Sequence, residues 1–315
     1  MTREELQQKL QFIQDERITK HLSVFVTTQT TGLQLFDIIN DDLSDLLKMF
    51  VDSIKQKLID DDQYSIVDYS TTVLRDNVIY RYDLPESRTM QMNRMSEVLD
   101  IQDHEKFNAD ETPIESITGI YVVIRGEMYQ NIVLYKYITA VDKTYARSSF
   151  LFFKDNDMFK RQKENLLRIS PVIHMIMVEN EILLLDMKKL ENSLGLKDIL
   201  VREAERDIQA VMDKRLVTDN QFLKKACGKT SMCKKLRHAL TKSKVILNGI
   251  DNKDIIKFAE NKRGKLQFHF NAAKDAFYIR SKAEAERFIK LLDDDFLHSE
   301  LSHEDYDSND KECMA

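Results

Sequence analysis

The sequence predicts an α+β fold: an N-terminal α+β domain, followed by a mainly antiparallel sheet with a helical C-terminal part. The chain has 315 residues, of which 43% are hydrophobic and 32% charged, so it can bury a core and form two domains. Strand-like apolar runs follow one another between residues 119 and 187, and helical periodicity dominates after them. The short connections favour antiparallel pairing, because parallel neighbours need a crossover of about a dozen residues.

The first domain is expected to span residues 1–110. Thr2 and Glu5 have the spacing of a capping box ahead of REELQQKLQFIQ, whose apolar residues recur at helical spacing. The expected elements are a helix, a strand pair, a second helix and a second strand pair: 3–14, 21–29 with 32–39, 41–58, and 63–70 with 77–84. Residues 85–113 are polar and irregular, which predicts a boundary near residue 110.

The second domain is expected to span residues 111–300, and residues 301–315 form an acidic tail that is expected to be disordered. Its strand-like runs are 119–126, 131–141, 147–153, 172–180 and 181–187. The runs with helical spacing are 187–195, 196–216, 231–243 and 252–264; two strands, 265–270 and 276–280, and a helix, 282–297, complete the prediction.

The net charge of −6 conceals a strong division along the chain. Residues 1–110 carry 12 basic and 21 acidic groups, residues 111–292 carry 34 and 23, and residues 293–315 carry one lysine and nine acidic groups. A polyanion responds to the local field within about 8 to 10 Å, so the basic middle of the chain is a candidate partner surface.

The three cysteines are too few for a disulfide framework, which favours a reducing compartment, and we expect a cytoplasmic protein. No apolar run approaches the roughly 18 to 20 residues of a membrane span. We therefore expect no direct membrane insertion, and any role at a membrane would need a partner.

The densest basic stretch is KKACGKTSMCKKLRHALTKSK, residues 224–244, which has eight Lys or Arg residues and no acidic one. Gly228-Lys229-Thr230 matches the end of a phosphate-binding loop, but Leu223 stands where the first glycine is needed. A zinc site would need companions for Cys227 and Cys233, and only His238 and His269 are available. We therefore expect neither a nucleotide nor a metal site here.

A surface for DNA or another polyanion is the remaining interpretation. On a helix over 231–243, an apolar stripe would face the core and the cations would point elsewhere. The candidate DNA-binding residues are Lys224, Lys225, Lys229, Lys234, Lys235, Arg237, Lys242 and Lys244. Replacing Lys234, Lys235 and Arg237 with glutamate is expected to abolish DNA binding and leave the fold intact. The alternative is a solvated lysine-rich face, or one that meets anionic lipid head groups.

A Mg²⁺-dependent nuclease is the competing hypothesis. Asp186 and Lys188 follow an apolar strand as the D-x-K half of such a site, with Glu179 or Asp155 as guesses for a further carboxylate. The simpler interpretation makes Asp186 the N-cap of the next helix. Unless the nuclease hypothesis holds, no cofactor is expected. His174, within PVIHMIMV, is expected to be a hydrogen-bonded core histidine.

Residues 115–300 also resemble the KwaB-like domain of the bacterial Kiwa anti-phage defence system. The resemblance rests on ILLLDMKKLENSLGL, the pair KLQFHF and FYIR, and the closing FIKLLDDDFLHSEL. It implies a protein at the periphery of the inner membrane, held there by a membrane-embedded partner, KwaA. It also implies binding to DNA without strong sequence preference, to block phage replication or gene expression. We expect a homodimer.

The acidic tail offers one further hypothesis. Its charge could occupy the basic surface in the absence of DNA, whereas the alternative is a tail that only aids solubility.

Overall fold

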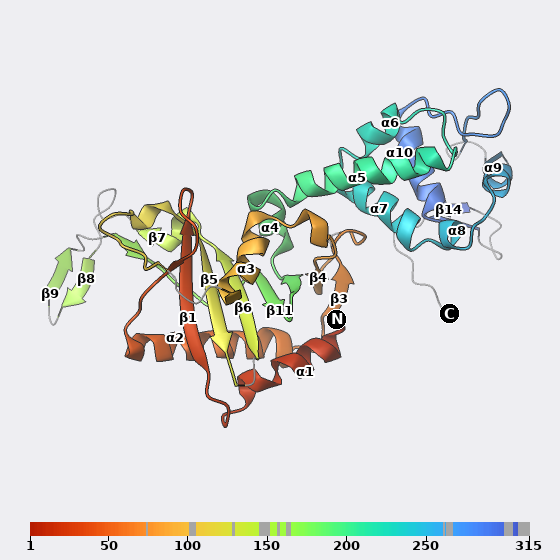
Figure 1. The fold of residues 1–315 in the computed structure, drawn as a ribbon. Coiled ribbons are helices and arrows are strands. Elements are labelled where there is room, and N and C mark those ends of the chain that lie inside the picture. Colours follow the sequence, from red (N-terminus) through yellow and green to blue (C-terminus); the bar gives the residue numbers. More distant parts are fainter. Residues whose placement is uncertain are drawn as a thin grey trace. The chain divides into compact units, whose positions relative to one another are not determined.

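The computed structural model describes residues 1–73, 75–100, 105–127, 130–144, 152–155, 158–161, 165–260, 262, 267–298 and 305–307. The chain forms two compact units (Figure 1). The sheet unit comprises Met1–Val67 and Asn77–Leu194, and the helical unit comprises Asp68–Asp76 and Gly195–Ala315. Together they confirm the predicted α+β class.

The sheet unit is built on an eight-stranded sheet with the order β2-β1-β5-β6-β11-β12-β4-β3. The strands are β1 (His21–Thr28), β2 (Gln34–Leu35), β3 (Ser65–Asp68), β4 (Val78–Arg81), β5 (Ile117–Arg125), β6 (Asn131–Tyr137), β11 (Met175–Val178) and β12 (Glu181–Leu184). The pairings from β2 through β1, β5, β6, β11 and β12 to β4 are antiparallel, as the short connections predict. Glu179 and Asn180 turn the chain between β11 and β12 with φ of 49° and 69°, values typical of a two-residue hairpin turn.

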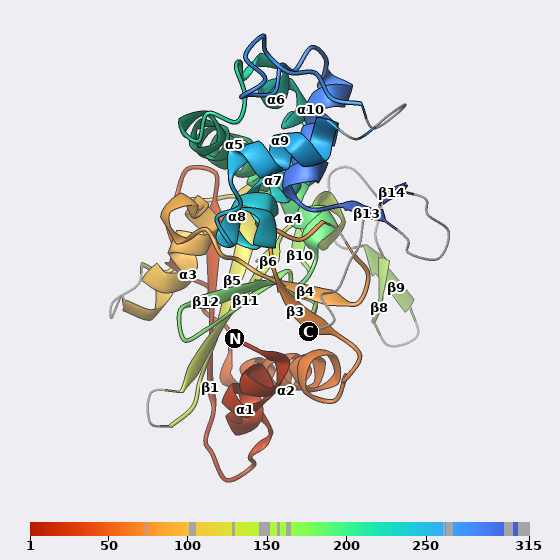
Figure 2. The ribbon, with the colours of Figure 1, turned by 90° about the vertical axis from the view of Figure 1, so that its right-hand side faces the viewer.

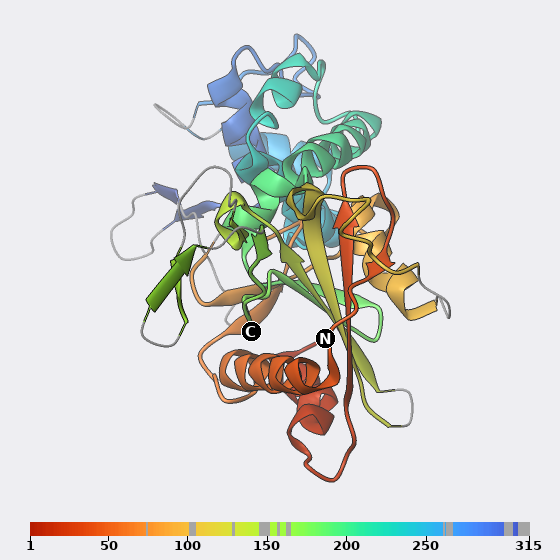
Figure 3. The ribbon, with the colours of Figure 1, turned by 90° about the vertical axis from the view of Figure 1, so that its left-hand side faces the viewer.

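Both faces of this sheet are covered, which explains the continuous apolar runs in its central strands. One face packs on α1 (Arg3–Gln14) and α2 (Asn40–Ile54), which lie together on that side of the sheet in Figures 2 and 3. The other face meets α3 (Met90–Asp100), where Met92 and Met95 are buried and the Ser96 hydroxyl donates to Met177 Sδ at 3.7 Å.

Short elements complete the sheet unit. The helical ones are a π-helical turn that continues α2 (Lys55–Ile59), three 3₁₀ turns (Pro85–Ser87, Ile114–Ser116, Ala140–Asp142) and α4 (Met187–Ser193). Two small two-stranded sheets join β7 (Lys143–Thr144) to β10 (Leu166–Leu167) and β8 (Phe152–Asp155) to β9 (Met158–Arg161).

The helical unit has the elements α5 (Leu196–Asp213), α6 (Gln221–Ala226), α7 (Thr230–Thr241), α8 (Lys244–Leu247), α9 (Asn252–Glu260), α10 (Lys282–Leu292), β13 (Phe296–His298) and β14 (Asp305–Asp307). Its core includes Phe277 and Phe288, whose ring centroids are 5.0 Å apart. The segment between β3 and β4 belongs to this unit. Within it Tyr69 is fully buried, and its hydroxyl donates to the Leu196 carbonyl at 3.2 Å.

The capping box at Thr2 and Glu5 and the helix behind it are confirmed. The chain does not divide at residue 110 as expected, because β1 pairs with β5 along its length, from His21 opposite Arg125 to Thr28 opposite Ile117. The irregular segment predicted for 85–113 was wrong in part, since it contains α3, in which Met92 and Met95 are buried.

The predicted strand pair near the C-terminus differs from the structure. The described parts of the predicted pair 265–270 and 276–280 form no strand; one bridge, Phe270 to Phe277, joins them, and Phe277 also bridges Val217. The predicted strand 147–153 and the predicted tail lie mostly outside the described residues. Of the tail only Asp305–Asp307 is described, as β14 paired with β13.

Candidate nucleic-acid interface

The centre of the basic stretch is α7, which packs against α5 and α10. Of the predicted apolar stripe, Met232, Leu236 and Ala239 are buried, whereas Leu240 is half-buried. The helix buries more than this stripe, however, because Lys234 and Lys235 are 2% and 8% exposed. For these two lysines the predicted outward orientation was wrong.

The two buried lysines have different surroundings. The Lys234 ammonium lies 4.3 Å from the centroid of the Tyr69 ring, a distance at which a cation and an aromatic face attract each other. The Lys235 ammonium forms an ion pair with Asp295, which is 1% exposed, and lies 3.8 Å from the Asp293 carboxylate. Such contacts make both side chains part of the core.

Arg237 also forms ion pairs within the helical unit. Its guanidinium lies 3.4 Å from Glu203 and 3.5 Å from Asp207, two carboxylates one turn apart on α5. Burial raises the pKa of Asp207, although the neighbouring Arg237 opposes the shift. The arginine therefore compensates buried acidic groups and is only 23% exposed along its side chain.

The remaining five candidates are on the surface, at opposite ends of α7. Lys229 pairs with Glu286 at 2.8 Å and Lys242 with Asp68 at 3.1 Å, yet their side chains stay 55% and 51% exposed. Lys224, Lys225 and Lys244 are exposed, and the Lys225 ammonium lies 4.7 Å above the Phe222 ring. Twelve helical residues separate the two groups, a rise of about 18 Å. The structure thus gives two basic groups in place of one continuous face.

The sequence concealed the acidic partners because they are distant along the chain. No acidic residue lies between positions 220 and 250, but α5, α10 and the segment between β3 and β4 bring carboxylates to the basic stretch. One pattern in the sequence did indicate an acidic partner surface. Glu203 and Asp207 are four residues apart, so on a helix their carboxylates share one face and can pair with a cation from another helix.

In the described part of the chain, no group of three or more metal-ligating side chains includes the cysteines or occurs elsewhere. Cys227 and Cys233 are buried, and the Cys233 thiol donates to the Cys227 carbonyl at 2.8 Å. The hydrogen bond with Cys233, together with burial, raises the pKa of the Cys227 thiol, which keeps it protonated. His238 and His269 instead bind Asp293 at 2.5 Å and Glu284 at 3.0 Å.

Gly228-Lys229-Thr230 connects α6 to α7 and does not follow a strand. A phosphate-binding loop needs a strand before it, so the structure agrees with the rejection of that motif.

Among the described residues of the nuclease hypothesis, Glu179 and Asp186 lie beyond opposite ends of β12. Asp186 caps α4, and its carboxylate accepts from the Lys189 backbone N–H at 3.1 Å. Lys188 is exposed. Glu179 occupies the β11–β12 turn and pairs with Lys9, and the Asp155 side chain lies outside what the structure describes.

This geometry predicts a structural effect for Asp186→Ala. Loss of the cap should lower the free energy of unfolding by about 1 kcal/mol, whereas Asp186→Asn, which can still accept from the Lys189 N–H, should cost less. Urea titration measures both values. Incubating the same proteins with DNA and Mg²⁺ provides the second readout, and cleavage that depends on Asp186 would contradict the capping role.

Lys136, Asp142 and Ser170 form a buried polar group in the sheet unit. The Lys136 ammonium donates to Asp142 at 2.7 Å and to the Ser170 hydroxyl at 2.6 Å. Burial would raise the pKa of Asp142, but hydrogen bonds from Lys136 and Thr139 lower it. The Lys136 ammonium is therefore held in a buried ion pair and donates to Ser170, which is unsuitable for a base that would activate this hydroxyl.

His174 is a core histidine with one hydrogen bond, as predicted from its apolar run. Its Nδ1 accepts from the Tyr137 backbone N–H at 2.9 Å, while the buried Nε2 has no partner among the described groups. Burial lowers its pKa to about 4. The ring is therefore neutral near pH 7, with its proton on Nε2.

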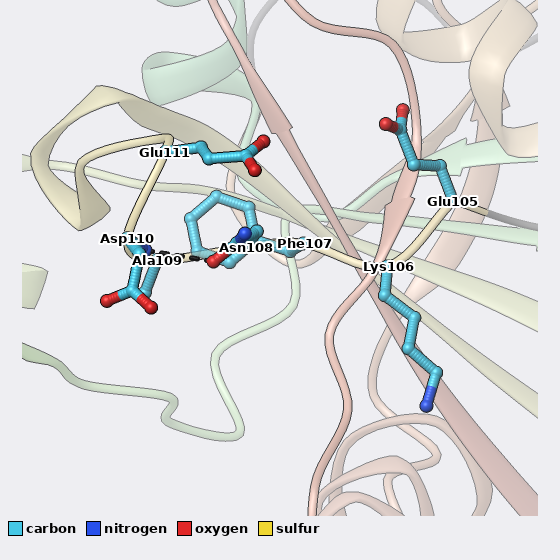
Figure 4. A pocket seen from close by; sticks show the side chains of 7 residues that line it. All are labelled: Glu105, Lys106, Phe107, Asn108, Ala109, Asp110 and Glu111. Carbon is cyan, nitrogen blue, oxygen red and sulfur yellow. Dashed lines mark hydrogen bonds between the residues drawn. The ribbon is translucent and has the colours of Figure 1, made fainter.

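Two open hollows lie elsewhere. One, of about 540 Å³, is lined by residues 105–111, and Figure 4 shows the carboxylates of Glu105, Asp110 and Glu111 pointing in different directions. The other, of about 560 Å³, lies in the helical unit between Met212, Val217 and the start of α9. The carboxylates of the first hollow therefore do not converge.

Comparison with known proteins identifies the family of this chain. The model of the Kiwa protein KwaB-like family matches residues 114–302. The chain belongs to the KwaB-like family. This KwaB-like protein is also 25% identical over 307 residues to Kiwa protein KwaB of Escherichia coli O55:H7 (strain RM12579 / EPEC), covering 96% of each chain. No solved structure matches it.

Membership in this family implies a role in anti-phage defence. In the described part of the KwaB-like chain, no helix is both long and apolar enough to cross a membrane.

Proposed function

We propose that this KwaB-like protein binds DNA without strong sequence preference, through the exposed lysines of the helical unit. It would act with the membrane-embedded partner KwaA, at the periphery of the inner membrane, to block phage replication or gene expression. The observation that carries the DNA-binding proposal is the exposure of Lys224 and Lys225 in a stretch without acidic residues. The partner and the location rest on the family alone.

The five exposed lysines have the properties of backbone contacts. A lysine ammonium neutralises a phosphate and releases counterions, which favours binding to any sequence. The separation of about 18 Å between the two groups along α7 allows contacts with phosphates on both strands of a duplex about 20 Å wide. The five lysines thus offer phosphate contacts that do not depend on the base sequence.

The test is the double variant Lys224→Glu, Lys225→Glu. Because both side chains are exposed, the variant should fold normally and bind a duplex oligonucleotide at least about tenfold more weakly. The salt dependence should also become shallower, since fewer counterions are released. Fluorescence anisotropy at two salt concentrations, with and without Mg²⁺, measures both effects.

The matched control is Lys55→Glu, Lys57→Glu on the sheet unit, which makes the same change in net charge at exposed positions. An equal loss of affinity in the control would show that net charge, and not this surface, determines binding.

A further inference from the structure

The helical unit exposes three large apolar side chains on α8, on α9 and in the turn between them. Leu247 is 61% exposed, Ile250 42% and Phe258 43%. The two helices adjoin in both Figure 1 and Figure 2. We call Leu247, Ile250 and Phe258 the α8–α9 face.

The local backbone keeps these side chains outside the core. The α9 helix buries Ile255, Ile256 and Ala259, and Phe258 lies on a flank of the helix outside this buried stripe. Gly249, at φ of 64°, reverses the chain between Leu247 and Ile250, and a Cβ at Gly249 would have no atom within 4 Å. The turn is therefore open to solvent, with an aliphatic side chain on each side of it.

Cations surround the α8–α9 face. Lys244, Lys253 and Lys257 are exposed, and the Lys262 ammonium lies 4.6 Å above the Phe258 ring. The acidic groups of this segment are Asp251, Asp254 and Glu260; Glu260 pairs with Lys274 at 3.1 Å. With Lys274 and its neighbour Asp275 included, five cations stand against four carboxylates, so the surroundings favour an anionic partner.

The side chains themselves indicate which anionic partner fits. Leu247 and Ile250 lack a flat ring on which a nucleic-acid base could stack, and the Lys262 ammonium already lies over the Phe258 ring, so nucleic acid gains little from this face. A bilayer surface accommodates both kinds of group, because aliphatic side chains enter the acyl boundary while lysines stay among the phosphates. Three residues are also far fewer than the roughly 20 to 30 that each partner contributes to a stable protein interface.

We propose that the α8–α9 face binds the surface of anionic phospholipid bilayers, with Leu247 and Ile250 inserted at the level of the head groups. This contact is shallow, and it is separate from the DNA-binding lysines Lys224 and Lys225. It would bring the protein to a membrane without a spanning helix.

The test is co-sedimentation of the full chain with vesicles. We expect binding to vesicles that contain phosphatidylglycerol, and much weaker binding to vesicles of phosphatidylcholine alone. Leu247→Ser, Ile250→Ser should weaken the first interaction at least about tenfold. The matched control Ile39→Ser, Val141→Ser changes side chains of the sheet unit that are 70% and 78% exposed, and it should bind as the unchanged chain does.

The outcomes separate this proposal from DNA binding. Leu247→Ser, Ile250→Ser should retain its affinity for duplex DNA, and Lys224→Glu, Lys225→Glu should retain most of its vesicle binding. Equal binding to both vesicle types, no binding to either, or an equal loss in the control would overturn the proposal. So would a lower molar mass of the serine variant in light scattering, since the face would then join two protein chains.

Discussion

Replacing Lys235 with glutamate is expected to unfold the helical unit. The Lys235 ammonium forms an ion pair with Asp295, which is 1% exposed, and Asp293 lies nearby at 3.8 Å. Removing one member of a buried ion pair costs about 3 to 5 kcal/mol, because the other charge stays buried without compensation. A glutamate adds repulsion between carboxylates. The variant should therefore lose the cooperative unfolding transition of this unit in a urea titration.

Two further variants distinguish this effect from a general loss of positive charge. Lys224→Glu makes the same charge change at an exposed position of α6 and should alter stability by less than about 1 kcal/mol. Lys235→Met with Asp295→Leu removes both charges, and it should recover much of the loss. Normal folding of Lys235→Glu would contradict the burial of this pair. Loss of DNA binding in Lys235→Glu is no evidence for a DNA contact, contrary to the expectation from the sequence.

The second large effect is acid destabilisation through His174. Its pKa is about 4 in the folded chain, against 6.5 ordinarily, because burial disfavours the charged ring. Between these values the unfolded chain binds a proton that the folded chain does not, so stability falls as the pH drops from 6.5 to 4. The loss reaches roughly 3 kcal/mol below pH 4. Above pH 6.5 the histidine contributes no pH dependence.

His174→Gln isolates this contribution, since an amide oxygen can still accept from the Tyr137 N–H and does not titrate. The difference in unfolding free energy between the two proteins should change with pH only between about 4 and 6.5, because the carboxylates are common to both. Urea titrations at several pH values measure it. Parallel pH profiles for the two proteins would contradict a buried neutral histidine.

The fold was largely predictable where local patterns decide structure. Thr2 and Glu5 cap the first helix as their spacing indicates, and the hydrophobic runs of β5, β6, β11 and β12 are strands because two apolar layers bury them. The sheet order could not be predicted. The pairing of β1 with β5 joins segments that are far apart in sequence, and the apolar periodicity within a strand contains no information about its neighbour.

For the candidate site as well, the sequence could not predict which residues meet in the folded chain. Counting charges along α7 identified a basic helix, but tertiary contacts determine which cations reach solvent. Lys234 meets a ring from the segment between β3 and β4, and Arg237 meets carboxylates of α5. Lys224 and Lys225 are exposed, whereas residues distant along the chain bury Lys234 and Lys235. The composition of the stretch contains no information about these neighbours, so it could not predict which lysines are exposed.

The segment Asp68–Asp76 makes the helical unit discontinuous in sequence. Tyr69 covers Lys234 and donates to Leu196, a partner 127 residues further along the chain. During synthesis from the N-terminus, Tyr69 therefore emerges long before the helices that it packs against. A contact that closes so long a loop forms slowly. Until the helical unit has been made, Tyr69 cannot pack into the core to which it belongs. The helical unit can complete its core only after the whole of the sheet unit has been made.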